Sequence, residues 1–266
     1  MPPSIDADAS PNHPPSPLAC SGHVEPTRTA LTASNGDENE PNFDAITAPD
    51  PTSLAESIEF VSREVFATPK LRSMQSWAID LCLEPTKVDS KLLFVTRTGY
   101  GKSHVMRTLG VLVGGVVVIL VPLLSLSADQ MNKMKEASQK YGTVETHHLD
   151  EFPTDDVGLK LRTLVDRINA LEETTTSTIF LFTSPQFLCE QSNEDLLNAL
   201  IKARARHVLR VVGIDEAHLF TEHAAFRIEI LMLTELFFKK VFDNDIETHP
   251  ILLAMTATLP LQYIRN

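Results

Sequence analysis

Apolar residues along this chain form short continuous runs separated by stretches with helical spacing. Five runs rich in Val, Ile, Leu and Phe predict strands, at 91–96, 116–121, 178–183, 208–215 and 251–258. Apolar residues three and four apart predict helices at 54–65, 70–81, 102–112, 125–140, 158–172, 193–205 and 223–240. Strands that are apolar on both faces and alternate with helices are typical of a parallel sheet covered on both sides. The pattern therefore predicts an α/β fold with a mostly parallel sheet.

The first 53 residues lack this pattern. They hold few large apolar residues, ten of the 17 prolines, and eight acidic residues against the single base Arg28. Such a segment buries too little surface to offset the entropy lost on ordering. We therefore expect a disordered, acidic, Pro-rich tail over 1–53 and one folded domain over 54–266.

Charge and cysteine content narrow the class of protein. The net charge of −12 is carried largely by the predicted tail, so a local basic groove on the folded domain is compatible with it. Cys20, Cys82 and Cys189 are far apart and have no disulfide or metal-ligand spacing, which favours an intracellular protein. The uncharged stretch 108–126 has the length of a membrane span, but Gly114, Gly115 and Pro122 divide it. We interpret it as a helix end followed by a buried strand, with no membrane segment.

The stretch TRTGYGKS (96–103) lies between a predicted strand and a predicted helix. Glycines in that context let backbone N–H groups turn toward phosphate oxygens at a helix N-terminus. Lys102 can reach the β- and γ-phosphates of a nucleotide, and Ser103 can place its hydroxyl on Mg²⁺. Thr96 stands where the general pattern has glycine, and a plain strand–helix turn is the alternative. The candidate cofactor-binding residues are Thr98, Gly99, Tyr100, Gly101, Lys102 and Ser103.

The stretch VVGIDEAH (211–218) ends an apolar strand with two carboxylates and a histidine. Because parallel strands end at one edge of the sheet, these acids should face the same crevice as Lys102. Asp215 would hold Mg²⁺, and Glu216 would orient and deprotonate an attacking water. His218 would couple the nucleotide state to its neighbours. A solvated acidic turn and a capping histidine are the alternatives.

Together these segments resemble the first motor domain of superfamily 2 helicases, and within them the RecQ-like DNA helicases. The motifs occur in family order as LRSMQ (71–75), TRTGYGKS (96–103), LVPLLSLSADQ (120–130), TSPQFL (183–188), DEAH (215–218) and TAT (256–258). The superfamily commonly replaces the first glycine of the phosphate loop, which accounts for Thr96. The resemblance implies a RecA-like P-loop fold, ATP and Mg²⁺ as cofactors, and a nucleic acid partner that is DNA rather than RNA. It also implies 3′–5′ translocation, DNA repair or recombination, and a nuclear location.

The resemblance also assigns residues. Gln75 is implied as the reader of adenine, with Arg72 beside it. The implied contacts with nucleic acid, and the coupling of hydrolysis to strand separation, fall on Pro122, Ser125, Ser184, Phe226, Arg227, Thr256 and Thr258.

The chain departs from the RecQ-like pattern in two places. The stretch LFTEHAAFR (219–227) stands where the family has an aromatic-rich, DNA-sensing loop, but it holds no Trp, and core packing competes with base stacking for Phe220 and Phe226. The sequence also contains no second motor domain, no zinc-binding part and no winged helix. The second motor domain supplies an arginine finger. We therefore expect weak or no hydrolysis by this chain alone, which would be either a truncated motor or a unit whose partner supplies the second motor domain.

Two alternatives remain open. The chain could be a non-catalytic module that binds ATP or nucleic acid on a helicase-derived fold. A signalling GTPase or a small-molecule kinase is poorly supported, because the DEAH and TAT motifs have no role in such a protein. The basic segment KARARHVLR (202–210) could contact phosphates, but cations in the last turn of a helix also complement its dipole, and this structural role is favoured.

Overall fold

The computed structural model describes residues 53–84, 91–121, 128–140, 142–152, 156–223, 228–242 and 249–258. Apart from Ser53, the predicted tail lies outside the described residues, and its disorder stays a prediction.

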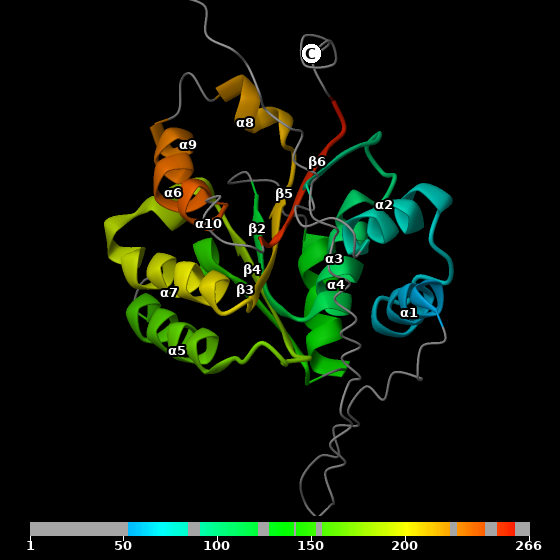
Figure 1. Cartoon of the computed structure of the whole chain (residues 1–266), viewed down its shortest axis with the longest axis horizontal. Helices are drawn as coiled ribbons and strands as arrows, with labels where there is room; N and C mark the ends of the chain where they lie inside the picture. The colour runs from blue at the N-terminus through cyan, green and yellow to red at the C-terminus, as the bar shows by residue number, and fades with distance from the viewer. Residues whose placement is uncertain are drawn as a thin grey trace, which may run out of the picture. The chain divides into compact units, whose positions relative to one another are not determined.

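Within the described residues, six strands form one sheet in the order β1-β6-β5-β2-β4-β3 (Figure 1). Every neighbouring pair is parallel. The strands are β1 (Lys91–Val95), β2 (Gly115–Leu120), β3 (Val144–His148), β4 (Thr178–Thr183), β5 (Leu209–Ile214) and β6 (Ile251–Thr256). The predicted α/β fold with a parallel sheet is confirmed.

Strand β3 is the one strand that the apolar pattern misses. Its sequence, VETHH, has a single apolar residue, Val144, which is buried. The strand lies at one end of the sheet and pairs only with β4, from Val144 opposite Thr178 to His148 opposite Phe182. An edge strand needs less apolar surface than a central one, so it gives no apolar run to detect.

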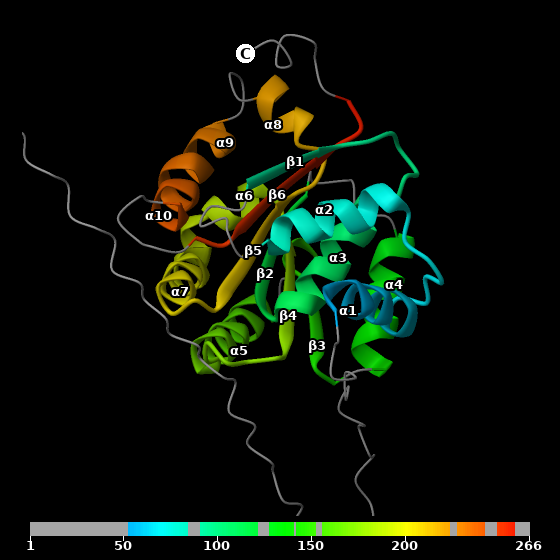
Figure 2. The same cartoon turned by 45° about the vertical axis from the view of Figure 1, so that its right-hand side comes forward.

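Helices cover both faces of the sheet (Figures 1 and 2). Successive residues of β2 alternate between two cores: Val117 and Ile119 pack toward the first group of helices, and Val116 and Val118 toward the second. The first group is α1 (Leu54–Phe60), α2 (Ser73–Leu83), α3 (Lys102–Val113) and α4 (Ala128–Lys140). The second group is α5 (Val157–Ala170), α6 (Pro185–Cys189), α7 (Glu194–Ala205), α9 (Ile228–Leu233) and α10 (Lys239–Val241).

Shorter elements complete the fold. Helix α8 (His218–His223) begins at the last residue of the DEAH motif and was not predicted. The helical stretch predicted over 223–240 is confirmed over 228–240, where α9, a π-helical turn and α10 follow one another without a break. Two π-helical turns extend helices α1 and α9, at Val61–Val65 and Thr234–Phe238. Two 3₁₀ turns precede helical segments, at Leu149–Glu151 and Gln191–Asn193.

The uncharged stretch after Thr108 divides between α3 and β2, as predicted. The two glycines between them, Gly114 and Gly115, have φ of 66° and 71°, a region that disfavours other residues. In the described part of the chain, no helix has both the length and the apolar character needed to cross a membrane.

The strand order decides where the motifs meet. The phosphate loop follows β1, the TAT motif ends β6, and the DEAH motif follows β5. Because β1, β6 and β5 are neighbours and parallel, their carboxyl ends lie side by side at one edge of the sheet.

Candidate functional site

The phosphate loop joins β1 to the first turn of α3. Gly99 and Gly101 have φ of 75° and 86°, and Gly101 is the N-cap of α3. This φ at Gly101 favours glycine, and a Cβ atom there would also displace Nε2 of Gln75. Lys102 and Ser103 form the first turn of α3, where the helix dipole favours an anion. Thr98 and Gly99 are exposed at the tip of the loop.

The N-terminal turn of α2 holds this loop. Nε2 of Gln75 donates to the carbonyl oxygens of Tyr100 (3.1 Å) and Gly101 (3.2 Å), and its Oε1 accepts from the Arg72 amide. The Arg72 guanidinium lies 4.5 Å from the centre of the Tyr100 ring, and its Nη1 donates to the Gly99 carbonyl. The predicted adenine reader is therefore at the loop, but its amide is bonded to the protein.

The DEAH turn is fixed by its backbone to two strands. The Asp215 amide donates to Leu120 O at the end of β2, and the Ala217 amide donates to Met255 O in β6. Glu216, between them, has φ of 47°, which is unusual for a residue other than glycine. Such local strain, held by neighbouring hydrogen bonds, is frequent at functional sites.

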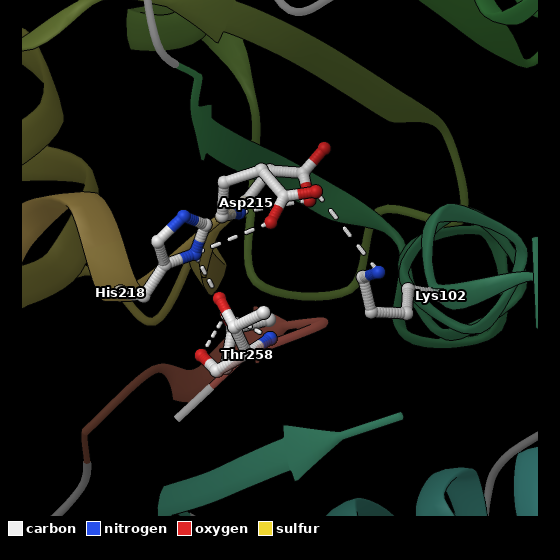
Figure 3. Close-up of polar contacts among 6 residues, drawn as sticks. Lys102, Asp215, His218 and Thr258 are labelled. Carbon is white, nitrogen blue, oxygen red and sulfur yellow. Dashed lines mark hydrogen bonds and ion pairs between the residues drawn. The ribbon is translucent and has the colours of Figure 1, made fainter. Parts of the chain in front are cut away.

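A chain of polar contacts crosses the site from Lys102 to the TAT motif (Figure 3). Lys102 Nζ lies 4.0 Å from one Glu216 carboxylate oxygen, and the other oxygen lies 3.4 Å from His218 Nδ1. His218 Nδ1 is also 2.8 Å from the Thr256 hydroxyl. Since that hydroxyl donates to Thr258 O at 2.7 Å, it accepts from His218, which places the imidazole proton on Nδ1.

Asp215 is the most buried carboxylate of the site, at 8% exposure. Burial, and next the charge of Glu216, raise the pKa of Asp215, while the Glu216 N–H and the Lys102 ammonium act in the opposite direction. A cation close to Asp215 would stabilise its ionised form. Carboxylate and hydroxyl oxygens are the hard ligands that Mg²⁺ prefers, so Asp215 and Ser103 suit that ion. The described residues include no cluster of three or more His, Cys, Asp or Glu side chains placed to bind a metal.

The predicted nucleic-acid contact Ser184 lies on the other half of the same edge, after β4. It is 1% exposed, and its hydroxyl caps α6 by accepting from the Phe187 amide at 3.1 Å. Its hydroxyl and its amide both donate to the Asp150 carboxylate. Here Ser184 is a helix cap, and a contact of its hydroxyl with nucleic acid stays a prediction.

Asp150 has a structural importance that the sequence did not reveal. It lies in the 3₁₀ turn after β3, the strand that the apolar pattern misses. The other predicted contacts, Pro122, Ser125, Phe226 and Arg227, lie outside the described residues.

Comparison with known proteins decides the family. A sequence model of the DEAD/DEAH box helicases matches residues 72–266, which is most of the chain. The chain belongs to this family. DEAD/DEAH box helicase domains bind ATP, generally with Mg²⁺, so the fold is that of a helicase-type ATP-binding motor domain.

A solved structure agrees with this fold. The helicase domain is similar to the crystal structure of the DUF1998 helicase MrfA, with a TM-score of 0.50 and 18% sequence identity. The match covers 79% of this chain and 30% of the MrfA chain, so the chain spans about a third of that protein. No curated protein sequence matches the chain.

The basic segment of the helicase domain serves largely as internal structure. Arg206 donates to the carbonyls of Ile168, Asn169 and Leu171, and so caps the C-terminus of α5. Arg204 is 3% exposed and donates to Val241 O. The favoured structural role is supported, although Arg206 serves the dipole of a neighbouring helix rather than its own.

Proposed function

We propose that this chain is the ATP-binding motor domain of a RecQ-like, ATP-dependent DNA helicase. The observation that carries the proposal is the meeting of three motifs at one edge of the sheet. Lys102 from the phosphate loop, Glu216 and His218 from the DEAH turn, and Thr256 from β6 form one chain of contacts. The RecQ-like assignment and the 3′–5′ polarity rest on the order of the sequence motifs and on the residues in them.

Each residue has a separate task in this proposal. The loop from Thr98 to Ser103 binds the phosphates, and Lys102 neutralises their charge as it develops. Ser103 and Asp215 would hold Mg²⁺, and the bound ion would supply electrostatic stabilisation of the transferring phosphoryl group. Glu216 orients the attacking water and accepts its proton. When Lys102 turns to the phosphates, the 4.0 Å contact with Glu216 is released and that carboxylate is free to act.

His218 and Thr256 would transmit the nucleotide state. His218 contacts both the carboxylate that changes partner and the hydroxyl of Thr256, which in turn fixes Thr258. A shift of Glu216 toward water therefore changes the hydrogen bonding of the TAT motif. Gln75 and Arg72 would exchange contacts with the loop for contacts with adenine.

A second candidate is a non-catalytic module that binds ATP or nucleic acid. One observation favours it: both amide hydrogens of Gln75 are donated to loop carbonyls, which leaves none for a base. The two candidates differ in whether Glu216 matters for turnover.

An ATPase assay with and without single-stranded DNA separates the candidates. The motor proposal predicts slow turnover, because the arginine finger comes from a second motor domain of the same polypeptide or of a partner. Glu216→Gln should lower turnover by about 10²–10⁴-fold and leave ATP binding intact. The matched control is Glu235→Gln, which changes an exposed carboxylate paired with Lys239.

Equal turnover by wild type and Glu216→Gln would reject the motor in favour of the binding module. Fast, DNA-stimulated turnover by the wild-type chain alone would instead reject the need for a second domain. Stimulation by RNA and not by DNA would contradict the choice of substrate. Roles in DNA repair or recombination, and a nuclear location, stay predictions of the resemblance.

A further inference from the structure

The side chain of Tyr100 is a part of the phosphate loop to which the proposed function gives no task. Phosphates are bound by backbone N–H groups and by Lys102, and neither needs an aromatic ring at this position. Tyr100 lies between Gly99 and Gly101 and is half-buried. Within the described residues, the one polar contact of its side chain is with the Arg72 guanidinium, whose central carbon lies 4.5 Å from the centre of the ring. The ring is therefore placed to act on Arg72 rather than on phosphate.

Arg72 is held to the loop by this ring and by one long hydrogen bond. Its Nη1 donates to the Gly99 carbonyl at 3.4 Å, which is beyond the usual range for an N–H···O bond. The distance to the Tyr100 ring is well within the range of a cation–π contact. Arg72 forms no ion pair in the part of the chain that the structure describes, and the residue is exposed. The ring is thus the main restraint on the guanidinium, and it leaves part of that group open to a ligand.

The first turn of α2 places this guanidinium beside the phosphate loop. Arg72 is the N-cap of α2, and Gln75 in the same turn donates to the carbonyls of Tyr100 and Gly101. The base of a nucleotide is joined to its phosphates through one ribose, so phosphates bound on the loop bring the base within reach of the long arginine side chain. A guanidinium already held over a ring also has less rotational freedom to lose when a base stacks on it.

We propose that Tyr100 is a positioning residue for the base of the bound nucleotide. Its ring holds the Arg72 guanidinium beside the loop, and the open side of that guanidinium stacks on the base, because planar guanidinium groups stack on aromatic faces. Arg72 would give up its long hydrogen bond with Gly99 and keep the ring. This inference rests on the proposed nucleotide site. It adds that one side chain of the phosphate loop contributes to binding of the base and not to binding of the phosphates.

Titration calorimetry on the full chain tests the proposal, with MgATP and with magnesium tripolyphosphate, which has no base. Tyr100→Leu should weaken the binding of MgATP about tenfold, because the stacking of a base is lost, and should leave the binding of tripolyphosphate unchanged. Tyr100→Phe, which keeps the ring and removes only the hydroxyl, should bind both probes as wild type does. The matched control is Trp77→Leu, which removes a 52% exposed ring of α2 outside the loop and should change neither affinity.

A double variant separates a joint role of Arg72 and Tyr100 from two independent roles. Arg72→Lys keeps the positive charge but loses the planar group that stacks, so it should weaken MgATP binding by about the same factor as Tyr100→Leu. Because the ring acts through the guanidinium, the combination of Arg72→Lys with Tyr100→Leu should bind MgATP no more weakly than Arg72→Lys alone. Thermal melting checks that each variant folds.

The outcomes that overturn the proposal differ from those that reject the nucleotide site. Equal losses for MgATP and tripolyphosphate in Tyr100→Leu would show that the ring shapes the loop for phosphates. Unchanged MgATP binding by Tyr100→Leu, an equal loss in Tyr100→Phe or Trp77→Leu, or losses that multiply in the double variant would overturn the proposal as well. In each of these cases wild type binds MgATP and the proposed nucleotide site stands. If wild type binds neither probe, that site is rejected and this proposal with it.

Discussion

The two halves of the carboxyl edge use polar side chains in opposite ways. On the half formed by β1, β6 and β5, both contacts of the Glu216 carboxylate are long: Lys102 Nζ is 4.0 Å from one oxygen, and His218 Nδ1 is 3.4 Å from the other. On the half formed by β4 and β3, Ser184 gives its amide and hydroxyl hydrogens to Asp150 and caps α6. The Glu216 carboxylate of the first half is therefore held only by long contacts, whereas both donors of Ser184 in the second half are bonded to Asp150.

This difference separates ligand sites from supports. A buried polar group whose hydrogen bonds are complete stabilises the fold, and removing one partner exposes the other to the full penalty of desolvation. A buried charge with poor partners weakens the empty fold and gains most when a ligand arrives. Substitutions on the first half should therefore affect binding, and substitutions on the second half should affect stability.

The largest effect is expected for Lys102→Ala. The affinity for MgATP should fall by about a hundredfold, because a charge-assisted contact with phosphate is lost. The free energy of unfolding should change little, since the one ion pair of the ammonium group among the described residues is the 4.0 Å contact with Glu216. Fluorescence titration with a labelled ATP analogue measures the affinity, and Lys135→Ala, at an exposed position of α4, is the control. Equal affinities of the two variants for MgATP would contradict the assignment of Lys102 to the nucleotide site.

His104 lies two residues after Lys102 in α3, but its contacts support the fold and not the nucleotide site. It is 6% exposed, its Nε2 lies 2.9 Å from the Ser62 hydroxyl, and burial, with Arg107 and Lys133, lowers its pKa to about 4. The unfolded chain therefore takes up a proton first, and stability present above pH 6.5 is lost as the pH falls toward 4, by about 3 kcal/mol at most. Urea unfolding across this range should show a shallower loss for His104→Gln than for wild type. An identical loss would show that His104 is not a buried neutral group.

Asp150→Ala should lower the free energy of unfolding by about 2 kcal/mol, because the buried Ser184 loses the acceptor of two part-buried hydrogen bonds. The affinity for MgATP should stay the same. Chemical denaturation measures the first quantity, with Asp166→Ala, at an exposed position of α5, as the control. A loss of ATP affinity without a loss of stability would show that Asp150 belongs with the ligand-binding residues and not with the supporting ones.

Asp215→Asn should have the smallest effect on stability, and it should raise the free energy of unfolding rather than lower it. Because the pKa of Asp215 is raised in the folded state, its ionised form weakens the fold above the pKa of the unfolded chain. The nucleotide-free variant should therefore be more stable than wild type at neutral pH, and the gain should vanish in acid. Its Mg²⁺-dependent binding of ATP should be lost. Destabilisation at neutral pH would show that the carboxylate supports the empty fold.

The chain's apolar runs were sufficient to predict most of the sheet and its parallel direction. They located β2, β4, β5 and β6 because these strands need apolar side chains on both faces. They missed β3, whose edge position is compatible with the polar sequence VETHH. Asp150 was missed for a different reason, because no local pattern marks an acid whose partner lies 34 residues away.

The motifs predicted which residues meet at the site but not how they are bonded. Four motif residues come together because the strands before them are neighbours in the sheet: Lys102, Glu216, His218 and Thr256. The alternation of strands and helices and the order of the motifs predict this meeting. The attachment of Gln75 to the loop carbonyls and the left-handed backbone of Glu216 depend on packing between segments distant in sequence. Sequence spacing does not contain that information.

Hydrogen exchange with and without MgATP tests the central claim most directly, since it reports on both halves of the edge in one experiment. We predict that MgATP slows amide exchange in residues 96–105, 215–218 and 256–258, and leaves residues 144–152 and 183–189 unchanged. Unchanged exchange at the phosphate loop and the DEAH turn, or protection confined to the β4–β3 half, would contradict the assignment of the nucleotide site.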